Sequence, residues 1–118
     1  MNAAHFTPDV AVGNVSDIPA EGARIVRVGA VEIGLFRTAD GQIFAIDNRC
    51  PHRGGPLSEG IVHGSHVTCP LHNWVFSLKT GKAEGPDEGC VKTLPVHVAD
   101  DGTVLLDLSD LSGFSTGG

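Results

Sequence analysis

Apolar and polar residues alternate in short runs between positions 23 and 48, where the chain reads ARIVRVGAVEIGLFRTADGQIFAIDN. Two runs rich in β-branched residues, Arg24–Val28 and Val31–Arg37, precede a third run, Gln42–Asn48. Asp-Gly commonly forms the turn between two antiparallel strands, and Asp40-Gly41 stands between the last two runs. The pattern therefore predicts a three-stranded antiparallel meander over this segment.

The C-terminal half shows the same short periods. A second Asp-Gly dipeptide, Asp101-Gly102, separates LPVHVA from TVLLDL, and Thr80-Gly81 marks another turn. Residues 50–72 are rich in Gly and Pro and predict loops, with one short strand expected around His66–Thr68. No window of about 12 residues shows a sustained helical period.

These patterns predict an all-β fold that is predominantly antiparallel. A chain of 118 residues is long enough for one well-packed domain and too short for two, so we predict a single domain spanning 1–118. The last residues, 110–118, are small and polar and predict a flexible tail.

Charge and composition exclude several classes of function. The formal net charge is −6 and the eight Lys and Arg residues are scattered, so no basic stripe is available to bind nucleic acid. No apolar run approaches the roughly 18 residues that cross a bilayer, and the N-terminal residues do not read as a signal peptide. We therefore expect a soluble, cytoplasmic protein, in which the three cysteines serve a metal or a thiol role and not a disulfide framework.

Two short Cys/His pairs carry the chemistry. Cys50 and His52 form C-x-H, and Cys69 and His72 form C-x-x-H. Thiolates and imidazoles at such spacing predict a metal site. A structural zinc site usually takes two like ligands from each segment, whereas here each segment supplies one of each type, so zinc stays open as an alternative on spacing alone.

The stretches around these pairs, CPHRGGPLSEG and CPLHNWVF, resemble the two cluster-binding loops of Rieske iron–sulfur proteins. The resemblance implies a [2Fe-2S] cluster in which Cys50 and Cys69 bind one iron and His52 and His72 bind the other. It also explains the mixed pairs, because two loops that face each other across the cluster must each reach both irons.

The resemblance places the two cluster-binding loops at about 50–56 and 69–76, at one end of a Rieske-like sandwich. Gly85-Pro86 resembles the third, proline-bearing loop that covers the cluster in this family. An ordinary turn is the alternative for that dipeptide.

The resemblance further predicts a centre of low reduction potential. High-potential Rieske proteins carry an additional cysteine in each loop, where this chain has Gly55 and Leu71, and place Ser and Tyr hydroxyls on the cluster sulfurs, where it has Trp74 and Phe76. We expect the two aromatic residues to pack beneath the cluster. Without those hydroxyl donors the potential should lie in the lower part of the Rieske range, which runs from about −150 to +300 mV.

Within this family, residues 45–98 look most like the small subunit of assimilatory NAD(P)H-dependent nitrite reductase. That resemblance implies an electron-transfer subunit that supports reduction of nitrite to ammonium in nitrate assimilation. Its partner would be a large subunit carrying flavin and sirohaem, or another redox protein, and no catalytic residue is expected in this chain. One alternative is a stand-alone Rieske ferredoxin that passes electrons to an aromatic-ring dioxygenase, and another is a zinc-stabilised binding module.

Four further cysteine and histidine residues are expected to have no part in binding the metal. Cys90, in DEGCVKT, is expected to be a small buried hydrophobe and not a ligand. His63 and His66 are expected on the surface, with a zinc or redox role as the alternative. His97 alternates with valines and should point outward from a strand.

Overall fold

The computed structural model describes residues 9–49, 56–70, 74–84, 89–108, 111 and 114. Its elements are β1 (Asp9–Asn14), the 3-10 helix η2 (Val15–Asp17), β2 (Gly22–Val28), β3 (Val31–Arg37), β4 (Ile43–Asp47), the 3-10 helix η3 (Leu57–Glu59), β5 (Ile61–His63), β6 (His66–Thr68), β7 (Val75–Ser77), β8 (Thr93–Leu94), β9 (Val96–Val98) and β10 (Thr103–Asp107). The strand pairs among these described residues are all antiparallel, which confirms the expected all-β fold. In this part of the chain, no helix is long and apolar enough to span a membrane.

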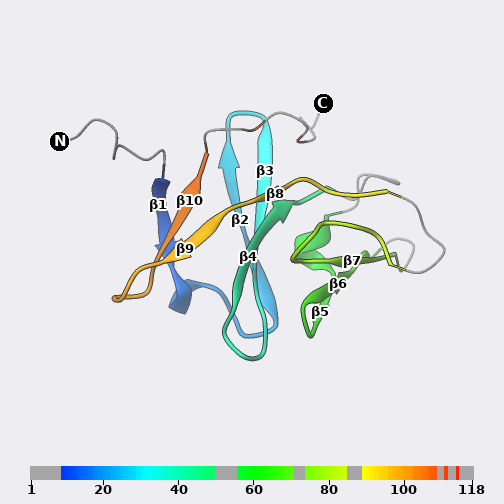
Figure 1. The fold of residues 1–118 in the computed structure, drawn as a ribbon, viewed down its shortest axis with the longest axis horizontal. Coiled ribbons are helices and arrows are strands. Elements are labelled where there is room, and N and C mark those ends of the chain that lie inside the picture. Colours follow the sequence, from blue (N-terminus) through cyan, green and yellow to red (C-terminus); the bar gives the residue numbers. More distant parts are fainter. Residues whose placement is uncertain are drawn as a thin grey trace.

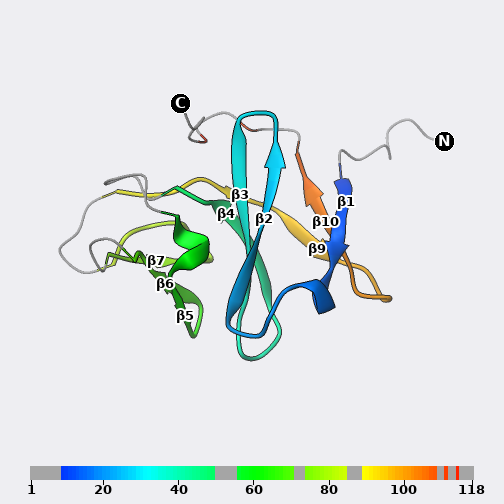
Figure 2. The ribbon, with the colours of Figure 1, turned by 180° about the vertical axis from the view of Figure 1, so that it is seen from behind.

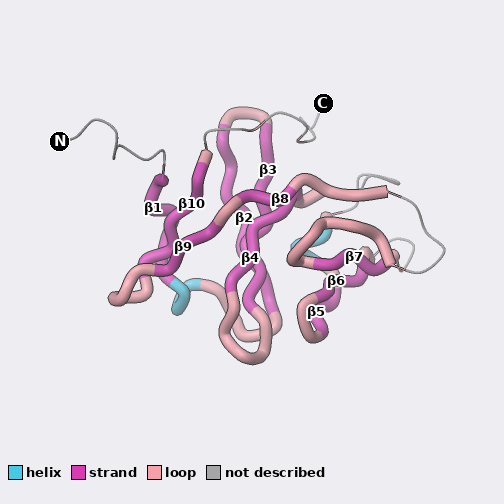
Figure 3. Tube along the Cα trace, in the orientation of Figure 1, coloured by secondary structure: helices cyan, strands magenta, loops and turns pink. Residues whose placement is uncertain are grey.

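The strands are arranged in three sheets (Figure 1). The terminal sheet has the order β1-β10-β9, the central sheet β2-β3-β4-β8, and the loop sheet β5-β6-β7. Seen from the front and from behind, the terminal sheet lies on one side of the central sheet and the loop sheet on the other (Figure 2). Among the described residues, the helical segments are the two short 3-10 turns η2 and η3, which lie between strands (Figure 3).

The predicted meander is confirmed as the β2-β3-β4 part of the central sheet. The pairing of β2 with β3 runs from Gly22 opposite Arg37 to Val28 opposite Val31. The turn between β3 and β4 uses Gly41 with a φ of 89°, a conformation that residues with a Cβ rarely adopt. The Asp-Gly signal therefore identified a turn whose backbone requires the glycine.

Strands β3 and β4 of the central sheet are buried on both faces. Alternate residues of a strand point to opposite faces, so Phe36 and Ile46 face one way while their neighbours Leu35 and Ala45 face the other. The first core packs the central sheet against the loop sheet and contains Phe36, Ile46, Leu57, Val62, Val67, Cys69, Phe76, Leu78 and Val91. The second core packs it against the terminal sheet and contains Ile18, Val31, Ile33, Leu35, Ala45, Leu94, Val104, Leu106 and Phe114.

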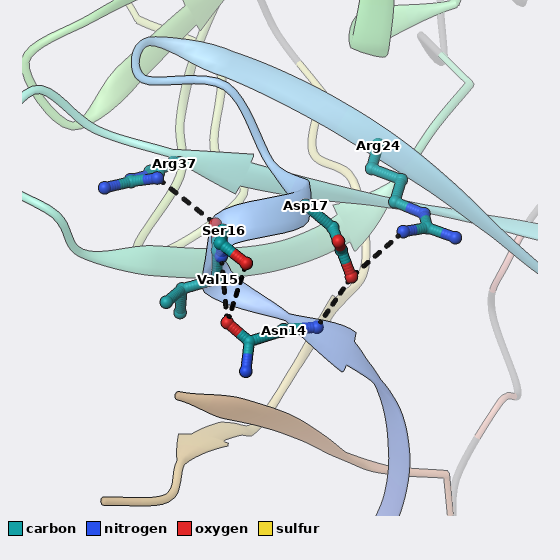
Figure 4. Close-up of polar contacts among 6 residues, drawn as sticks. All are labelled: Asn14, Val15, Ser16, Asp17, Arg24 and Arg37. Carbon is teal, nitrogen blue, oxygen red and sulfur yellow. Dashed lines mark hydrogen bonds and ion pairs between the residues drawn. The ribbon is translucent and has the colours of Figure 1, made fainter. Parts of the chain in front are cut away.

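A polar network attaches β1 and η2 to the central sheet (Figure 4). The N–H of Asn14 donates to the carboxylate of Asp17 at 3.0 Å, and the same carboxylate lies 3.3 Å from the guanidinium of Arg24. Arg37 donates to the carbonyl oxygen of Val15 at 3.2 Å. This network lies beside the second core, on the side of the terminal sheet.

Three features differ from the patterns read in the sequence. The strand β1 was not predicted, and it pairs with β10 at the opposite end of the chain. A strand was expected at β6 alone within residues 50–72, but β5 pairs with it. Phe114 is only 7% exposed and belongs to the second core, so at this position the expected flexible tail is instead packed; apart from Leu111, the other residues of 110–118 lie outside the described part.

Candidate metal centre

Of the four predicted ligands, the structure describes Cys69, while Cys50, His52 and His72 lie outside the described residues. Cys69 follows β6 directly, carries a free thiol, and is 0% exposed in the first core. Strand β6 therefore ends at a sulfur that is buried in the first core.

The ends of the first loop are closed against each other. Arg49 and Pro56 form an antiparallel bridge on either side of residues 50–55. The N–H of Leu57 donates to the carbonyl oxygen of Asn48 at 2.6 Å, and the N–H of Ser58 donates to the Asn48 side-chain oxygen at 2.7 Å. The chain therefore enters and leaves this loop at one place, next to the first core.

The second loop is closed in the same manner. The N–H of Cys69 donates to the carbonyl oxygen of Trp74 at 2.7 Å, and Thr68 is paired with Val75 in the β6-β7 ladder. Phe76 is buried in the first core, and the Trp74 ring packs beside it with 6.2 Å between ring centroids. The predicted packing of these two aromatic residues beneath a cluster stays a prediction, because the residues that would hold the cluster lie mostly outside the described part.

The segment expected as the third loop begins and ends beside the second loop. The N–H of Ala83 donates to the carbonyl oxygen of Gly89 at 3.0 Å, across residues 85–88. The N–H of Glu84 donates to the carbonyl oxygen of Val75 at 2.8 Å, which joins this segment to the edge of the loop sheet. The bases of all three predicted loops therefore meet around the loop sheet and the first core.

Charged and polar side chains flank the loop bases. The hydrogen bond from Asn48 holds the pKa of Glu32 below its usual range, and Arg27 and Arg49 add to this effect by their charge. On the outer face of the loop sheet, His63 and His66 are paired across the β5-β6 hairpin with parallel rings 6.1 Å apart.

Histidine and cysteine residues outside the ligand set lie as follows. The side chain of His66 is 34% exposed and lies 3.5 Å from Glu84, and the largely exposed His63 hydrogen bonds to Thr68, so the surface placement predicted for both histidines is confirmed. His97 is exposed on β9, as predicted. The predicted burial of Cys90 is wrong, because this residue is exposed; its backbone forms an isolated bridge to Lys82 beside the third segment.

The residues present fit an iron–sulfur group. Cys69 is a fully buried soft sulfur donor at a strand end, and the base of the loop that carries the other Cys/His pair of the sequence is closed, as a cluster held between two loops requires. Among the described residues, no group of three or more His, Cys, Asp or Glu side chains gathers into a competing metal site.

The comparison with protein families decides the matter: the model of the Rieske [2Fe-2S] domain matches residues 9–95. The chain belongs to the Rieske family. Its cofactor is a Rieske-type [2Fe-2S] cluster, and its role is electron transfer within an oxidoreductase system. The matched range runs from β1 to the residue after β8 and includes all three predicted loops.

Relatives of this Rieske protein include dioxygenase ferredoxins and a nitrite reductase small subunit. The ferredoxin subunit of 3-phenylpropionate/cinnamic acid dioxygenase from Photorhabdus laumondii subsp. laumondii is 41% identical over 101 residues, which cover 84% of this chain and 93% of the relative. A chain of the complex between reduced oxygenase and oxidised ferredoxin in carbazole 1,9a-dioxygenase aligns with a TM-score of 0.73 at 31% identity, over 82% of this chain and 99% of that one. A protein assigned as the small subunit of nitrite reductase (NADPH) aligns with a TM-score of 0.74 at 28% identity, over 83% and 96% of the two chains.

Residues that organise the loop bases were missed by reasoning from the sequence. Asn48 and Leu57 hold the first loop closed, yet the sequence placed Asn48 only at the end of a strand and gave no role to Leu57. No local signal could have indicated either role, because both depend on contacts across the loop.

Proposed function

We propose that this chain is a Rieske ferredoxin that carries electrons, one at a time, from a reductase to the terminal oxygenase of an aromatic-ring dioxygenase. The observation that carries the proposal is the 41% identity to a dioxygenase ferredoxin subunit, which extends over 93% of that subunit. The similarity therefore spans a whole small carrier protein. The sequence resemblance to the nitrite reductase small subunit favours a different redox system, the NAD(P)H-dependent nitrite reductase.

In this proposal Cys50 and Cys69 hold one iron, and His52 and His72 hold the other. The cluster supplies a site that accepts and releases a single electron without breaking a bond. The protein residues position and insulate that site. Cys69 belongs to the first core, which excludes water from one side of the proposed site, and the closed bases of both loops fix where each loop begins and ends.

A second candidate function is the small subunit of an NAD(P)H-dependent nitrite reductase, which supports reduction of nitrite to ammonium in nitrate assimilation. Two observations favour it: the resemblance of residues 45–98 to that subunit, and the fold shared with a protein of that assignment at 28% identity. In this case the partner is a large subunit with flavin and sirohaem, and the chain would remain bound to it.

A reconstitution experiment separates the two functions. The cluster-loaded chain is mixed in one assay with the reductase and oxygenase of a 3-phenylpropionate dioxygenase, and in another with the large subunit of an NADH- or NADPH-dependent nitrite reductase. We expect NADH oxidation coupled to aromatic substrate and oxygen in the first assay, and no dependence of nitrite consumption on the chain in the second.

The control is Cys69→Ser, which removes a proposed iron ligand and should abolish the NADH oxidation that depends on aromatic substrate. If the chain supported NADH- or NADPH-dependent nitrite consumption alone, the second candidate would replace the ferredoxin proposal. A colourless protein with one bound zinc and no electron paramagnetic resonance (EPR) signal after reduction would contradict both functions.

A further inference from the structure

Asn48 stands just before the first loop, and each of its nitrogen and oxygen atoms takes part in a hydrogen bond. It is 1% exposed and follows the last residue of β4. Its N–H donates to the carbonyl oxygen of Glu32 at 3.0 Å, and its carbonyl oxygen accepts from the N–H of Leu57 at 2.6 Å. Its side-chain Nδ2 donates to Oε1 of Glu32 at 3.2 Å, and its Oδ1 accepts from the N–H of Ser58 at 2.7 Å. Buried polar groups bonded this completely strongly favour one arrangement of the chain around them.

Two of these bonds cap the helix that follows the loop. The first N–H groups of a helix lack partners within the helix and are usually satisfied by the side chain before it. In η3 that position is Pro56, which makes no side-chain hydrogen bond. Asn48, at the other end of the loop, provides this cap instead, because its two oxygen atoms accept hydrogen bonds from the N–H groups of Leu57 and Ser58. The residue at which the loop begins thus fixes the residues at which it ends.

The other two bonds fix Asn48 to the central sheet and determine the orientation of its amide. Glu32 lies opposite Arg27 in the β2-β3 ladder, and Nε of Arg27 donates to Oε2 of Glu32 at 3.3 Å. The Glu32 carboxylate offers only acceptors, so the NH₂ group of the Asn48 amide must face it. The amide oxygen must then face the N–H of Ser58, which is the direction that capping requires.

We propose that Asn48 is a positioning residue for the [2Fe-2S] cluster, which clamps both ends of loop 50–55 to β3 and thereby sets the placement of Cys50 and His52. This inference rests on the proposed assignment of those two residues as ligands. Asn48 acts through the backbone and touches neither iron. Substitutions of residues that orient metal ligands typically reduce metal affinity by about 10- to 100-fold, so the loss of the clamp is expected to be measurable at the cluster.

An exchange of donor and acceptor tests the clamp. Asn48→Asp keeps the size of the side chain and the acceptor for Ser58, but it places a second carboxylate against Glu32 in place of the donor. In the double variant Asn48→Asp/Glu32→Gln, the new amide can donate to the carboxylate at position 48 while its oxygen still accepts from Arg27. Glu32→Gln alone keeps an acceptor for the Asn48 amide. The matched control is Asn14→Asp, at another capping asparagine, in the network beside the second core.

Four readouts are taken on the cluster-loaded chain: iron and sulfide per chain, the EPR g-values after reduction, the midpoint potential, and the half-life of the visible colour. We expect Asn48→Asp to shift the g-values and the potential and to shorten the half-life about tenfold. The double variant should recover most of each change, Glu32→Gln should change the readouts less than Asn48→Asp does, and Asn14→Asp should resemble wild type.

A structural role alone would lower the melting temperature without altering g-values or potential, and that result would overturn the inference. Failure of the double variant to recover any readout would overturn it as well. If Asn48→Asp does not fold, Asn48→Ser removes both side-chain bonds without adding a charge, and an unchanged spectrum and potential in that variant would refute the clamp. The wild-type spectrum is recorded first, because the absence of a Rieske signal there would refute the ligand assignment and the inference together.

Discussion

Leu57→Ala and Leu106→Ala form a matched pair of perturbations, one in each core. Both leucines are 0% exposed, Leu57 in the first core and Leu106 in the second. Truncation of a fully buried leucine removes its burial free energy and leaves a cavity, at a cost of about 2–5 kcal/mol. We expect each variant to lose about 3 kcal/mol of the free energy of unfolding, which a domain of ordinary stability tolerates.

The two variants should differ at the cluster. Leu57 lies directly after the first loop, and its N–H closes that loop through Asn48, whereas Leu106 lies in β10 of the terminal sheet. Free energies of unfolding are measured by urea titration. The g-values, the midpoint potential and the rate of cluster loss are measured under native conditions. Leu57→Ala should change all three cluster readouts, and Leu106→Ala should leave the g-values and potential as in wild type.

Two results would refute this reasoning. If Leu106→Ala altered the cluster spectrum as much as Leu57→Ala, the two cores would not be mechanically separate. If Leu57→Ala lost the expected free energy but kept the wild-type g-values and potential, the packing of Leu57 would not govern the first loop.

Three further predictions concern single positions. A Cβ at Gly60 would lie 2.1 Å from the carbonyl oxygen of Thr68. Gly60→Ala should therefore lower the free energy of unfolding, measured by urea titration, by about 1–3 kcal/mol and should shift the cluster spectrum. An unchanged spectrum would contradict the idea that β6 affects the cluster site. The hydroxyl and N–H of Thr103 hold the pKa of Asp101 below its ordinary value, so wild-type stability should fall as the pH drops below about 4, through the folded-state pKa. In Asp101→Asn, the free energy of unfolding measured by urea titration should fall less steeply between about pH 5 and 3. The same dependence on pH in both proteins would refute this prediction. Cys69→Ser should yield protein without the Rieske absorption and with little iron, and an intact reduced-state EPR signal would exclude Cys69 as a ligand.

Much of the fold could be predicted from the sequence because its signals are local. The meander is built from adjacent runs, and β3 was predicted at its observed bounds, Val31–Arg37. The turns at Gly41 and Gly102 have φ values of 89° and 88°, which only glycine adopts easily, so the dipeptides that contain them are reliable signals. The pairing of cysteine with histidine in each loop similarly identified a family, and through it a cofactor.

The remainder depends on contacts between distant segments. β1 is held by its pairing with β10, and β5 has only three residues, too few for a pattern to stand out. The exposure of Cys90 reflects its position next to a loop and not its residue type. The hydrogen bonds of Asn48 join β3 to η3, and nothing in the neighbouring residues indicates them.

The pairing of Asp9 with Asp107 has a practical consequence for electrochemistry. The first and last strands of the fold are adjacent in the terminal sheet, and the central sheet separates them from the loop sheet (Figure 1). A linker attached before β1, between the protein and an electrode or bead, would hold the protein on the side of the terminal sheet, opposite the loop sheet. Such an attachment would leave the loop sheet directed away from the electrode, where a soluble redox partner could approach it.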